Sequence, residues 1–261
     1  MYLMKINFYM MKKATGCFVF MVMSYMAVAQ PSFVDYQKNF PRVAGAMNHK
    51  LDTLKKQFAA AGLQWDHCEI YIRSFKYDSE LEVWAKNSGD ETFKLFKTYK
   101  VCALAGTLGP KRMEGDYQVP EGFYCINQFK PNSNYHLSLG INYPNASDKI
   151  LSDHETPGGS IFIHGSCVTV GCIPIQDYQI EELYIIAAVA RSSGQDFIPV
   201  HIFPIRFDVN ESMNYFVQIT KGDQELQKFE ESLKTVYDYF NKEKKLPVIS
   251  VDDDGTYKVM E

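Results

Sequence analysis

The sequence has little that would bind nucleic acid. Its 27 Lys and Arg residues are outnumbered by 31 Asp and Glu residues, and neither a long block of like charge nor a low-complexity tract occurs. Phosphate backbones recruit clustered basic side chains, so a nucleic-acid partner is excluded. No internal repeat is visible. The composition, 46% apolar and 22% charged, is that of a globular protein with a real core.

The N-terminus has the pattern of a secretory signal peptide. Lys12 and Lys13 precede an uncharged run, residues 14–29, that ends in the small-x-small triplet Ala27-Val28-Ala29. The run is shorter than the roughly 20 residues of a membrane span. We therefore expect residues 1–29 to be removed, a periplasmic or secreted protein, and no stable membrane span after cleavage. An uncleaved anchor is the alternative.

Cysteine number gives the first indication of chemistry. Removal of the signal peptide would leave Cys68, Cys102, Cys125, Cys167 and Cys172. Because five is an odd number, an exported monomer keeps at least one unpaired thiol. A free thiol is a liability in an oxidising compartment, which suggests a use for it. The alternative is a small buried apolar side chain.

Apolar periodicity predicts an α+β fold dominated by a mixed or antiparallel sheet. Residues 40–63 have helical spacing and end near Gly62, and residues 177–194 form a second helix with Asp177 as its N-cap. Two further helices lie in residues 210–245, and a weak hairpin follows. Strand-type segments rich in Ile, Val, Tyr and Phe are residues 68–75, 81–87, 93–106, 121–129, 135–143, 160–165 and 198–207.

The stretch IFIHGSCVTVGCIPIQD, residues 161–177, is the candidate for catalysis. A buried strand would display His164 and Gly165 at its end, and a tight loop would return Gly171 and Cys172 beside them. His164 would accept the Cys172 proton, the Gly165 carbonyl would orient the imidazole, and the pairing would lower the pKa of the thiol. The amides of Gly171 and Cys172 would hold a developing oxyanion.

Other uses of the same residues stay open. His164, Cys167 and Cys172 offer three zinc ligands, but the paired Cys-x2-Cys spacing and an obvious fourth ligand are missing. A Cys167–Cys172 disulfide would silence the nucleophile, or would make the chain a thiol-disulfide protein if it cycled. The catalytic interpretation needs no metal or cofactor, and we expect none.

These residues match a known family. The His-Gly and Gly-Cys pairs, VPEGFY at 119–124 and YHLSLGINYPN at 135–145 resemble the L,D-transpeptidase catalytic domain of the YkuD type, and most of all its YafK-like branch. The resemblance implies a mixed β-sandwich core with flanking N- and C-terminal helices. It implies the following organisation: signal peptide 1–29, helical segment 30–64, catalytic domain 65–207 and C-terminal helical extension 208–261.

The resemblance implies an exported enzyme that acts on peptidoglycan stem peptides, including stems linked to a lipoprotein. Cys172 would be the nucleophile and His164 the base; a thioester acyl-enzyme would pass its acyl group to an amine or to water. Val170 and Pro174 stand where the usual pattern has His and Arg, which fits the YafK-like branch and weakens a claim of crosslink formation. The alternative is a catalytically silent wall-binding module with the same fold.

Substrate contacts are predicted from two segments upstream of the motif. Lys111 and Arg112 in the polar loop 109–122 would pair with stem carboxylates, and Glu114 or Asp116 with a free amine. His136, on an alternating strand, would bind substrate or assist proton transfer. Tyr143 is a candidate for the wall of the cleft. The alternatives are a solvated loop for the charged residues and a packing role for His136.

Overall fold

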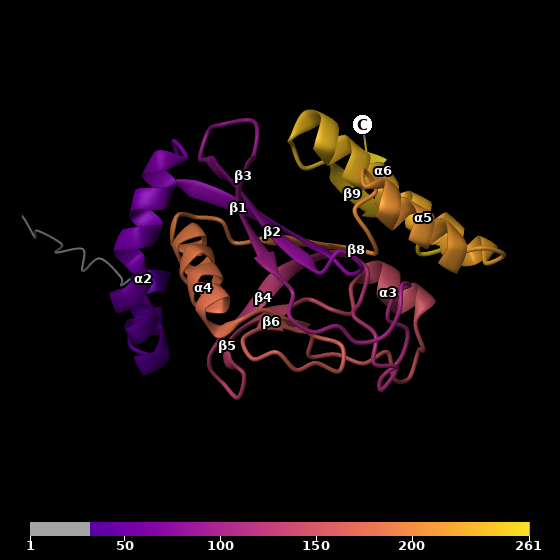
Figure 1. Ribbon diagram of the computed structural model, residues 1–261, viewed down its shortest axis with the longest axis horizontal. Helices are drawn as coiled ribbons and strands as arrows, with labels where there is room; N and C mark the ends of the chain where they lie inside the picture. Colours follow the sequence, from indigo (N-terminus) through magenta and orange to yellow (C-terminus); the bar gives the residue numbers. More distant parts are fainter. Residues whose placement is uncertain (1–31, 261) are drawn as a thin grey trace, which may run out of the picture. The chain divides into compact units, whose positions relative to one another are not determined.

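Eight strands form one mixed sheet in the computed structural model, which describes residues 32–260 (Figure 1). The predicted signal peptide lies outside the described residues. In spatial order the strands are β3 (Lys94–Lys100), β2 (Glu80–Asn87), β1 (Cys68–Phe75), β8 (Pro199–Phe203), β4 (Gly122–Ser133), β5 (His136–Ile141), β6 (Phe162–His164) and β7 (Ile173–Pro174). The predicted sheet-dominated α+β fold is confirmed, and these eight strands belong to one continuous sheet.

The sheet is mixed because two of its pairings are parallel. β1 runs parallel to β8, and β6 runs parallel to β7, whereas the other neighbours are antiparallel. β1 and β2 form an antiparallel hairpin. The long strand β4 pairs with β8 through Gly122–Cys125 and with β5 through its remaining residues, so it connects the two halves of the sheet.

The central strand β1 shows why both faces of the sheet are covered. Side chains alternate along a strand, so Ile70 and Ile72 pack on one face, while Tyr71 and Phe75 pack on the other. The first face meets α4 (Asp177–Ser192) and α2 (Pro41–Ala60), which lie side by side in Figure 1. A short helix, α1 (Phe33–Gln37), also packs on α4.

The C-terminal elements cover the other face. They are α5 (Asn210–Ile219), α6 (Gln224–Glu243) and the antiparallel pair β9 (Val248–Val251) and β10 (Tyr257–Met260). α6 buries an apolar stripe made of Phe229, Leu233, Val236 and Phe240. Leu226, one turn earlier on the same helix, is only half-buried. Tyr237 packs against Phe75, and Phe240 against Tyr71, so α6 is held to β1 by aromatic contacts.

Helix boundaries agree with the sequence to within a few residues, with one correction. The residue before the first turn of α4 is Gln176, not Asp177, and Gln176 exchanges side-chain and backbone hydrogen bonds with Gln179. Asp177 is instead the first helical residue, and its carboxylate turns back toward the loop before the helix. The segment between β5 and β6 contains α3 (Ala146–Leu151), which the sequence did not predict.

The described residues belong to one compact unit. The predicted boundaries at 64/65 and 207/208 therefore stay predictions about organisation within that unit. Within residues 32–260, no helix combines the length and apolarity that a membrane crossing requires.

Candidate active site

The parallel pairing of β6 and β7 brings the two halves of the motif together. Ile163 lies opposite Ile173, and His164 lies opposite Pro174. Both isoleucines are buried in the main core. Cys172 immediately precedes β7, so it returns beside the strand that carries His164. The predicted return of the chain to the end of the His strand is therefore found.

Two glycines fix this return because no larger residue fits. Gly171 has φ +141°, and a Cβ there would lie 2.9 Å from the carbonyl oxygen of Gln118. At Gly165 a Cβ would lie 2.5 Å from a carboxylate oxygen of Asp177 and 3.0 Å from the Cβ of His136. The backbone at both positions is thus pressed against neighbouring segments, which holds the loop of residues 165–172 in place.

Side-chain contacts brace the same loop. The Thr169 hydroxyl accepts from the Gly171 amide at 3.0 Å and donates to the Cys172 carbonyl at 2.8 Å. The Asp177 carboxylate accepts from the Ser166 amide at 2.8 Å. The Gly171 amide, which the sequence predicts as an oxyanion donor, is therefore already bonded within the loop.

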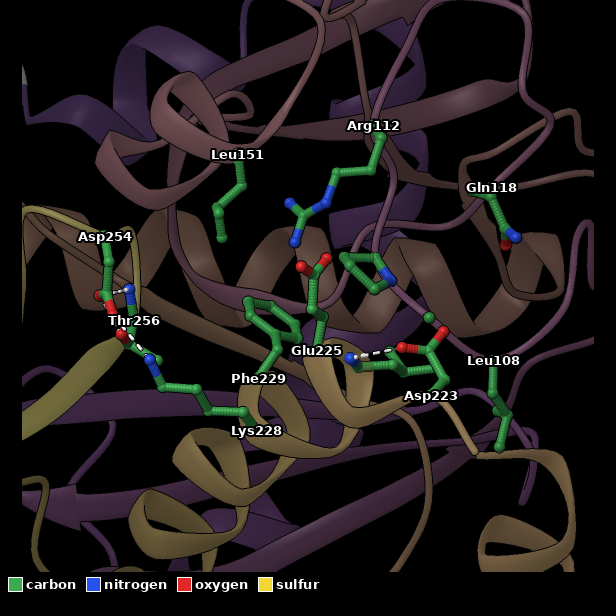
Figure 2. Close-up of a pocket in the computed structure, with 13 residues that line it drawn as sticks. Leu108, Arg112, Gln118, Leu151, Asp223, Glu225, Lys228, Phe229, Asp254 and Thr256 are labelled. Carbon is green, nitrogen blue, oxygen red and sulfur yellow. Dashed lines mark hydrogen bonds and ion pairs between the residues drawn. The ribbon is translucent and has the colours of Figure 1, made fainter. Parts of the chain in front are cut away.

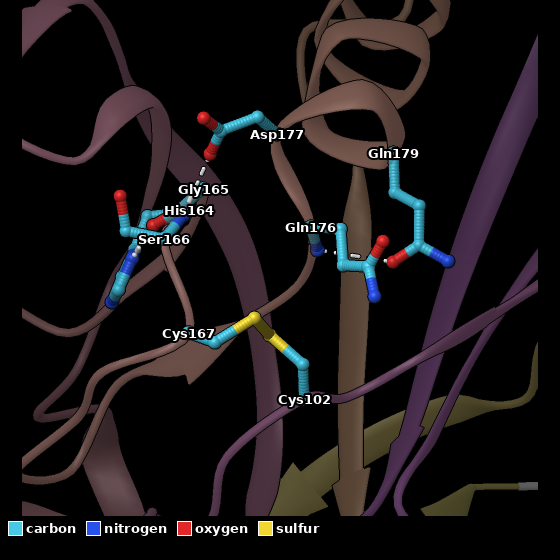
Figure 3. The surroundings of a disulfide bond; sticks show 8 residues. All are labelled: Cys102, His164, Gly165, Ser166, Cys167, Gln176, Asp177 and Gln179. Atoms are coloured by element: carbon cyan, nitrogen blue, oxygen red, sulfur yellow. Dashed lines mark hydrogen bonds between the residues drawn. A yellow bond between two sulfur atoms is a disulfide. The ribbon is translucent and has the colours of Figure 1, made fainter.

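A disulfide settles which cysteines pair. Cys102, which follows β3, is bonded to Cys167, and the two Cα atoms are 5.3 Å apart (Figure 3). Cys172 is left as a free thiol, together with Cys68 and Cys125. The alternative Cys167–Cys172 disulfide is thereby excluded in this structure, and the zinc alternative loses Cys167 as a ligand.

Cys172 opens into a cavity of about 290 Å³, which we name the cysteine cavity. Its thiol lies 3.7 Å from the carbonyl oxygen of Ser160. The other lining residues come from two loops, 111–117 and 158–161, and from the motif itself: Lys111, Glu114, Gly115, Tyr117, Gly158, Gly159, Ile161, Val170 and Gly171.

Burial raises the pKa of the Cys172 thiol, although the Phe162 amide and the charge of Lys111 act in the opposite direction. This direction corrects the sequence prediction of a lowered thiol pKa. The resting residue is consequently a protonated thiol, which needs a base before it can attack.

His164 is suited to be that base. It is 2% exposed, and Nδ1–H donates to the Gly165 carbonyl at 2.5 Å, as the sequence predicts for the orienting group. Since Nδ1 carries the proton, Nε2 has the free lone pair. The Tyr135 ring lies over the imidazole with centroids 4.7 Å apart. Burial lowers the pKa of His164, so the ring is neutral at neutral pH. Within residues 32–260, no hydrogen bond joins Cys172 to His164.

Of the predicted substrate-contacting residues, Glu114 and Lys111 line the cysteine cavity. The Lys111 ammonium donates to the Met113 carbonyl at 2.7 Å and pairs with Asp116 at 2.5 Å. These two bonds leave the third N–H of the ammonium for another acceptor.

The other predicted contacts lie outside this cavity. Arg112 lines a separate cavity. Tyr143 is buried, and its hydroxyl donates to the Pro157 carbonyl at 2.8 Å, so it supports the 158–161 wall from behind. His136 lies beside Gly165 and pairs with Glu181 at 2.9 Å.

Sequence reasoning missed Ser160, Tyr117, Thr169 and Tyr135. Gly158 is a sequence signal for the close approach of this wall, since a Cβ there would lie 3.0 Å from the Lys111 side chain.

Comparison with known proteins identifies relatives of the chain. No protein-family model matches the chain. The chain is 36% identical over 193 residues to the Escherichia coli K12 protein "Putative L,D-transpeptidase YafK", covering 73% of each, and equally to its Escherichia coli O157:H7 counterpart.

Among solved structures, the helical cell shape determining protein Pgp2 from Campylobacter jejuni shares 20% identity, with a TM-score of 0.43 and coverage of 73% of this chain and 75% of that one. Bdellovibrio bacteriovorus Bd1075 shares 18%, with a TM-score of 0.38 and coverage of 66% and 62%. Both TM-scores are low, so neither structure bears on the function of this chain.

Proposed function

The chain belongs to the YafK-like branch of the L,D-transpeptidase family, and from this premise we propose that it is an exported cysteine enzyme acting on peptidoglycan stem peptides. Cys172 is the nucleophile and His164 the base. The acyl group leaves either to an amine or to water. The catalytic step follows from the protonation states of the two side chains.

Attack begins from a neutral pair. The resting thiol and the neutral imidazole carry no net charge, so proton transfer to His164 accompanies attack on the stem carbonyl instead of preceding it. The Cys172 sulfur bonds to the carbonyl carbon, and the C–N bond of the stem amide breaks. The proton held by the imidazole goes to the departing amine. A thioester remains on Cys172.

The second half reverses the same proton path. An incoming amine or water gives its proton to His164 as it attacks the thioester carbonyl, and the proton then returns to the Cys172 sulfur as it leaves. The Gly165 carbonyl keeps Nδ1 protonated and Nε2 available throughout. Burial lowers the pKa of His164 and so disfavours the imidazolium. The protonated ring therefore gives its proton readily to the departing amine or sulfur.

Charges in the cysteine cavity position the stem. Lys111 retains one N–H for a stem carboxylate, and Glu114 is the acceptor for a stem ammonium. Because the Gly171 amide is bonded to Thr169, we assign the oxyanion contact to the Cys172 amide. Cell-wall stems linked to a lipoprotein are substrates of the same class.

The observation that supports this proposal most is a free cysteine in a charged cavity, immediately before β7, which pairs with the strand of a neutral, carbonyl-oriented histidine. The test is digestion of purified peptidoglycan followed by muropeptide analysis. The wild-type protein should produce new muropeptides, and the Cys172→Ala protein should produce none. The control is Cys125→Ala, which removes a free thiol outside the cavity and should give the wild-type pattern. The product identifies transfer or hydrolysis.

A second candidate is a wall-binding module without catalysis. It is favoured by the raised pKa of Cys172 and by the missing hydrogen bond to His164 within the described residues. If the chain is such a module, its wild-type and Cys172→Ala forms should bind peptidoglycan equally well, and neither form should release a product.

A further inference from the structure

A second and larger cavity lies where the C-terminal elements meet the core. We name it the C-terminal cavity; its volume is about 530 Å³, which is in the range of sites for small ligands. Figure 2 shows its residues. They come from the 108–118 loop, the end of α3, the start of α6 and the β9–β10 turn: Leu108, Gly109, Pro110, Arg112, Gln118, Leu151, Asp223, Glu225, Leu226, Lys228, Phe229, Asp254 and Thr256.

Arg112 is the cation of this cavity, and it is only partly satisfied. Its guanidinium lies over the Phe229 ring, 5.0 Å from the centroid. Its Nη1 is 3.8 Å from Asp148 Oδ1, which is beyond hydrogen-bond distance. Within the described part of the chain, neither of these two buried atoms has a hydrogen-bond partner. A planar guanidinium held in this way is suited to bind a carboxylate.

Two carboxylates face the same space. Figure 2 shows Glu225 directed toward Arg112, yet no ion pair joins the two among residues 32–260. Asp223 caps α6 through the Leu226 amide at 2.9 Å and keeps its second oxygen. Lys228 and Asp254 neutralise each other at 2.7 Å. Apart from the long 3.8 Å ion pair between Arg112 and buried Asp148, the charges that face a ligand are one positive and two negative.

This charge pattern selects the class of ligand. A phosphate or a polyanion would be repelled by Glu225 and Asp223, and a simple cation by Arg112. A ligand with one carboxylate and one nearby ammonium satisfies both signs. The aliphatic part of such a ligand has an apolar wall available, made of Leu108, Pro110, Leu151, Leu226 and Phe229.

The C-terminal cavity is adjacent to the cysteine cavity through a shared loop. Lys111 lines the cysteine cavity, whereas the next residue, Arg112, lines the C-terminal cavity. Gln118 also lines the C-terminal cavity, and its backbone carbonyl oxygen is the atom against which Gly171 is pressed. A long peptide substrate would thus meet both cavities on the two sides of one loop.

We propose that the C-terminal cavity binds the zwitterionic end of a peptide, with its carboxylate on Arg112 and its ammonium between Glu225 and Asp223. This inference rests on the proposed function for the choice of a peptide, because peptidoglycan stems end in such groups. It adds a peptide subsite outside the cavity of the nucleophile.

The test is a site-resolved NMR titration of the Cys172→Ala protein. The probe is the tripeptide L-alanyl-γ-D-glutamyl-meso-diaminopimelate. Amide shifts of Leu226 and Thr256 report the C-terminal cavity, and the amide shift of Val170 reports the cysteine cavity. Saturable shifts at Leu226 and Thr256 are expected. Added Glu225→Gln or Arg112→Gln should weaken that binding at least tenfold, and Glu231→Gln, an exposed carboxylate on the same helix, should not.

A probe with its diaminopimelate carboxyl groups amidated should also lose this binding. Unchanged affinity for the amidated probe, unchanged affinity in Glu225→Gln, or no shift at Leu226 and Thr256 would overturn the proposal. Glu225 is exposed and makes no side-chain hydrogen bond or ion pair among residues 32–260, so its variant remains informative if Arg112→Gln unfolds. The titration does not require turnover, so the subsite proposal can hold even if the enzyme proposal fails. If the wild-type protein releases products but these shifts are absent, only the subsite proposal is refuted.

Discussion

Replacement of Gly171 by alanine tests whether the backbone beside the nucleophile is held as described. The residue has φ +141°, a region that L side chains rarely adopt, and its new Cβ would lie 2.9 Å from the Gln118 carbonyl oxygen. Neither atom can be moved by rotating a side chain, so the backbone must shift. Strain of this kind costs about 1–3 kcal/mol. For a chain of this size, that lowers Tm by roughly 2–12 °C.

The effect on activity should be larger than the effect on stability. A shift of the Gly171 backbone moves the Cys172 sulfur directly, and a misplacement of about 1 Å in an active site costs on the order of 100-fold in rate. Gly159 offers a matched control, since it lines the same cavity, its backbone is outside the left-handed region and no atom lies within 4 Å of a Cβ there. Gly159→Ala should stay within about 0.5 kcal/mol of wild type.

The assays are thermal unfolding and muropeptide release by both variants. If Gly171→Ala unfolds at the wild-type temperature and releases muropeptides at the wild-type rate, the close contact with Gln118 does not exist, and the reasoning about the loop is refuted.

Three further predictions concern the same loop and its surroundings. Loss of the Cys102–Cys167 disulfide, which closes a span of 65 residues, should lower the free energy of unfolding by about 4 kcal/mol in the chain-entropy treatment; calorimetry of the double Ser variant measures it, and an unchanged Tm would contradict it. The pKa of His164 is lowered in the folded state, so the unfolded chain binds the proton more readily and stability is lost as pH falls below 6.5; His164→Gln should flatten that loss, and equal pH slopes would refute the burial argument. The charge of Lys111 lowers the pKa of Cys172, so the Lys111→Met variant should show an alkylation midpoint of the thiol at higher pH. The Lys111→Arg variant keeps the charge and should not show this shift. Identical midpoints for the Lys111→Met and wild-type proteins would contradict the contact.

Strands and helices were predictable where one physical signal dominated. β1 reads as a strand because Ile, Tyr and Phe occupy both of its faces, and α6 reads as a helix because its apolar residues recur at one face. The N-cap of α4 was misassigned because Asp177 satisfies the general preference, while the local exchange between Gln176 and Gln179 decides the boundary.

The composition of the site was predictable only in part. His164 and Cys172 are close in sequence, so the motif indicated both. The walls of the cysteine cavity come from loops at 111–117 and 158–161, and no periodic pattern records that two irregular segments approach each other. For the same reason the sequence could not show that Arg112 lines a cavity separate from that of Cys172, and Cys102 could not be chosen as the partner of Cys167.

The central claim is that Cys172 carries the acyl group of a stem peptide while His164 moves the proton. Intact-mass and peptide-mapping mass spectrometry after brief incubation with stem tetrapeptide tests it most directly. The account predicts a thioester adduct on Cys172 in wild type and none in His164→Ala, with both proteins folded. Stem cleavage that proceeds without any adduct on Cys172, or an adduct that forms equally fast without the imidazole, would contradict it.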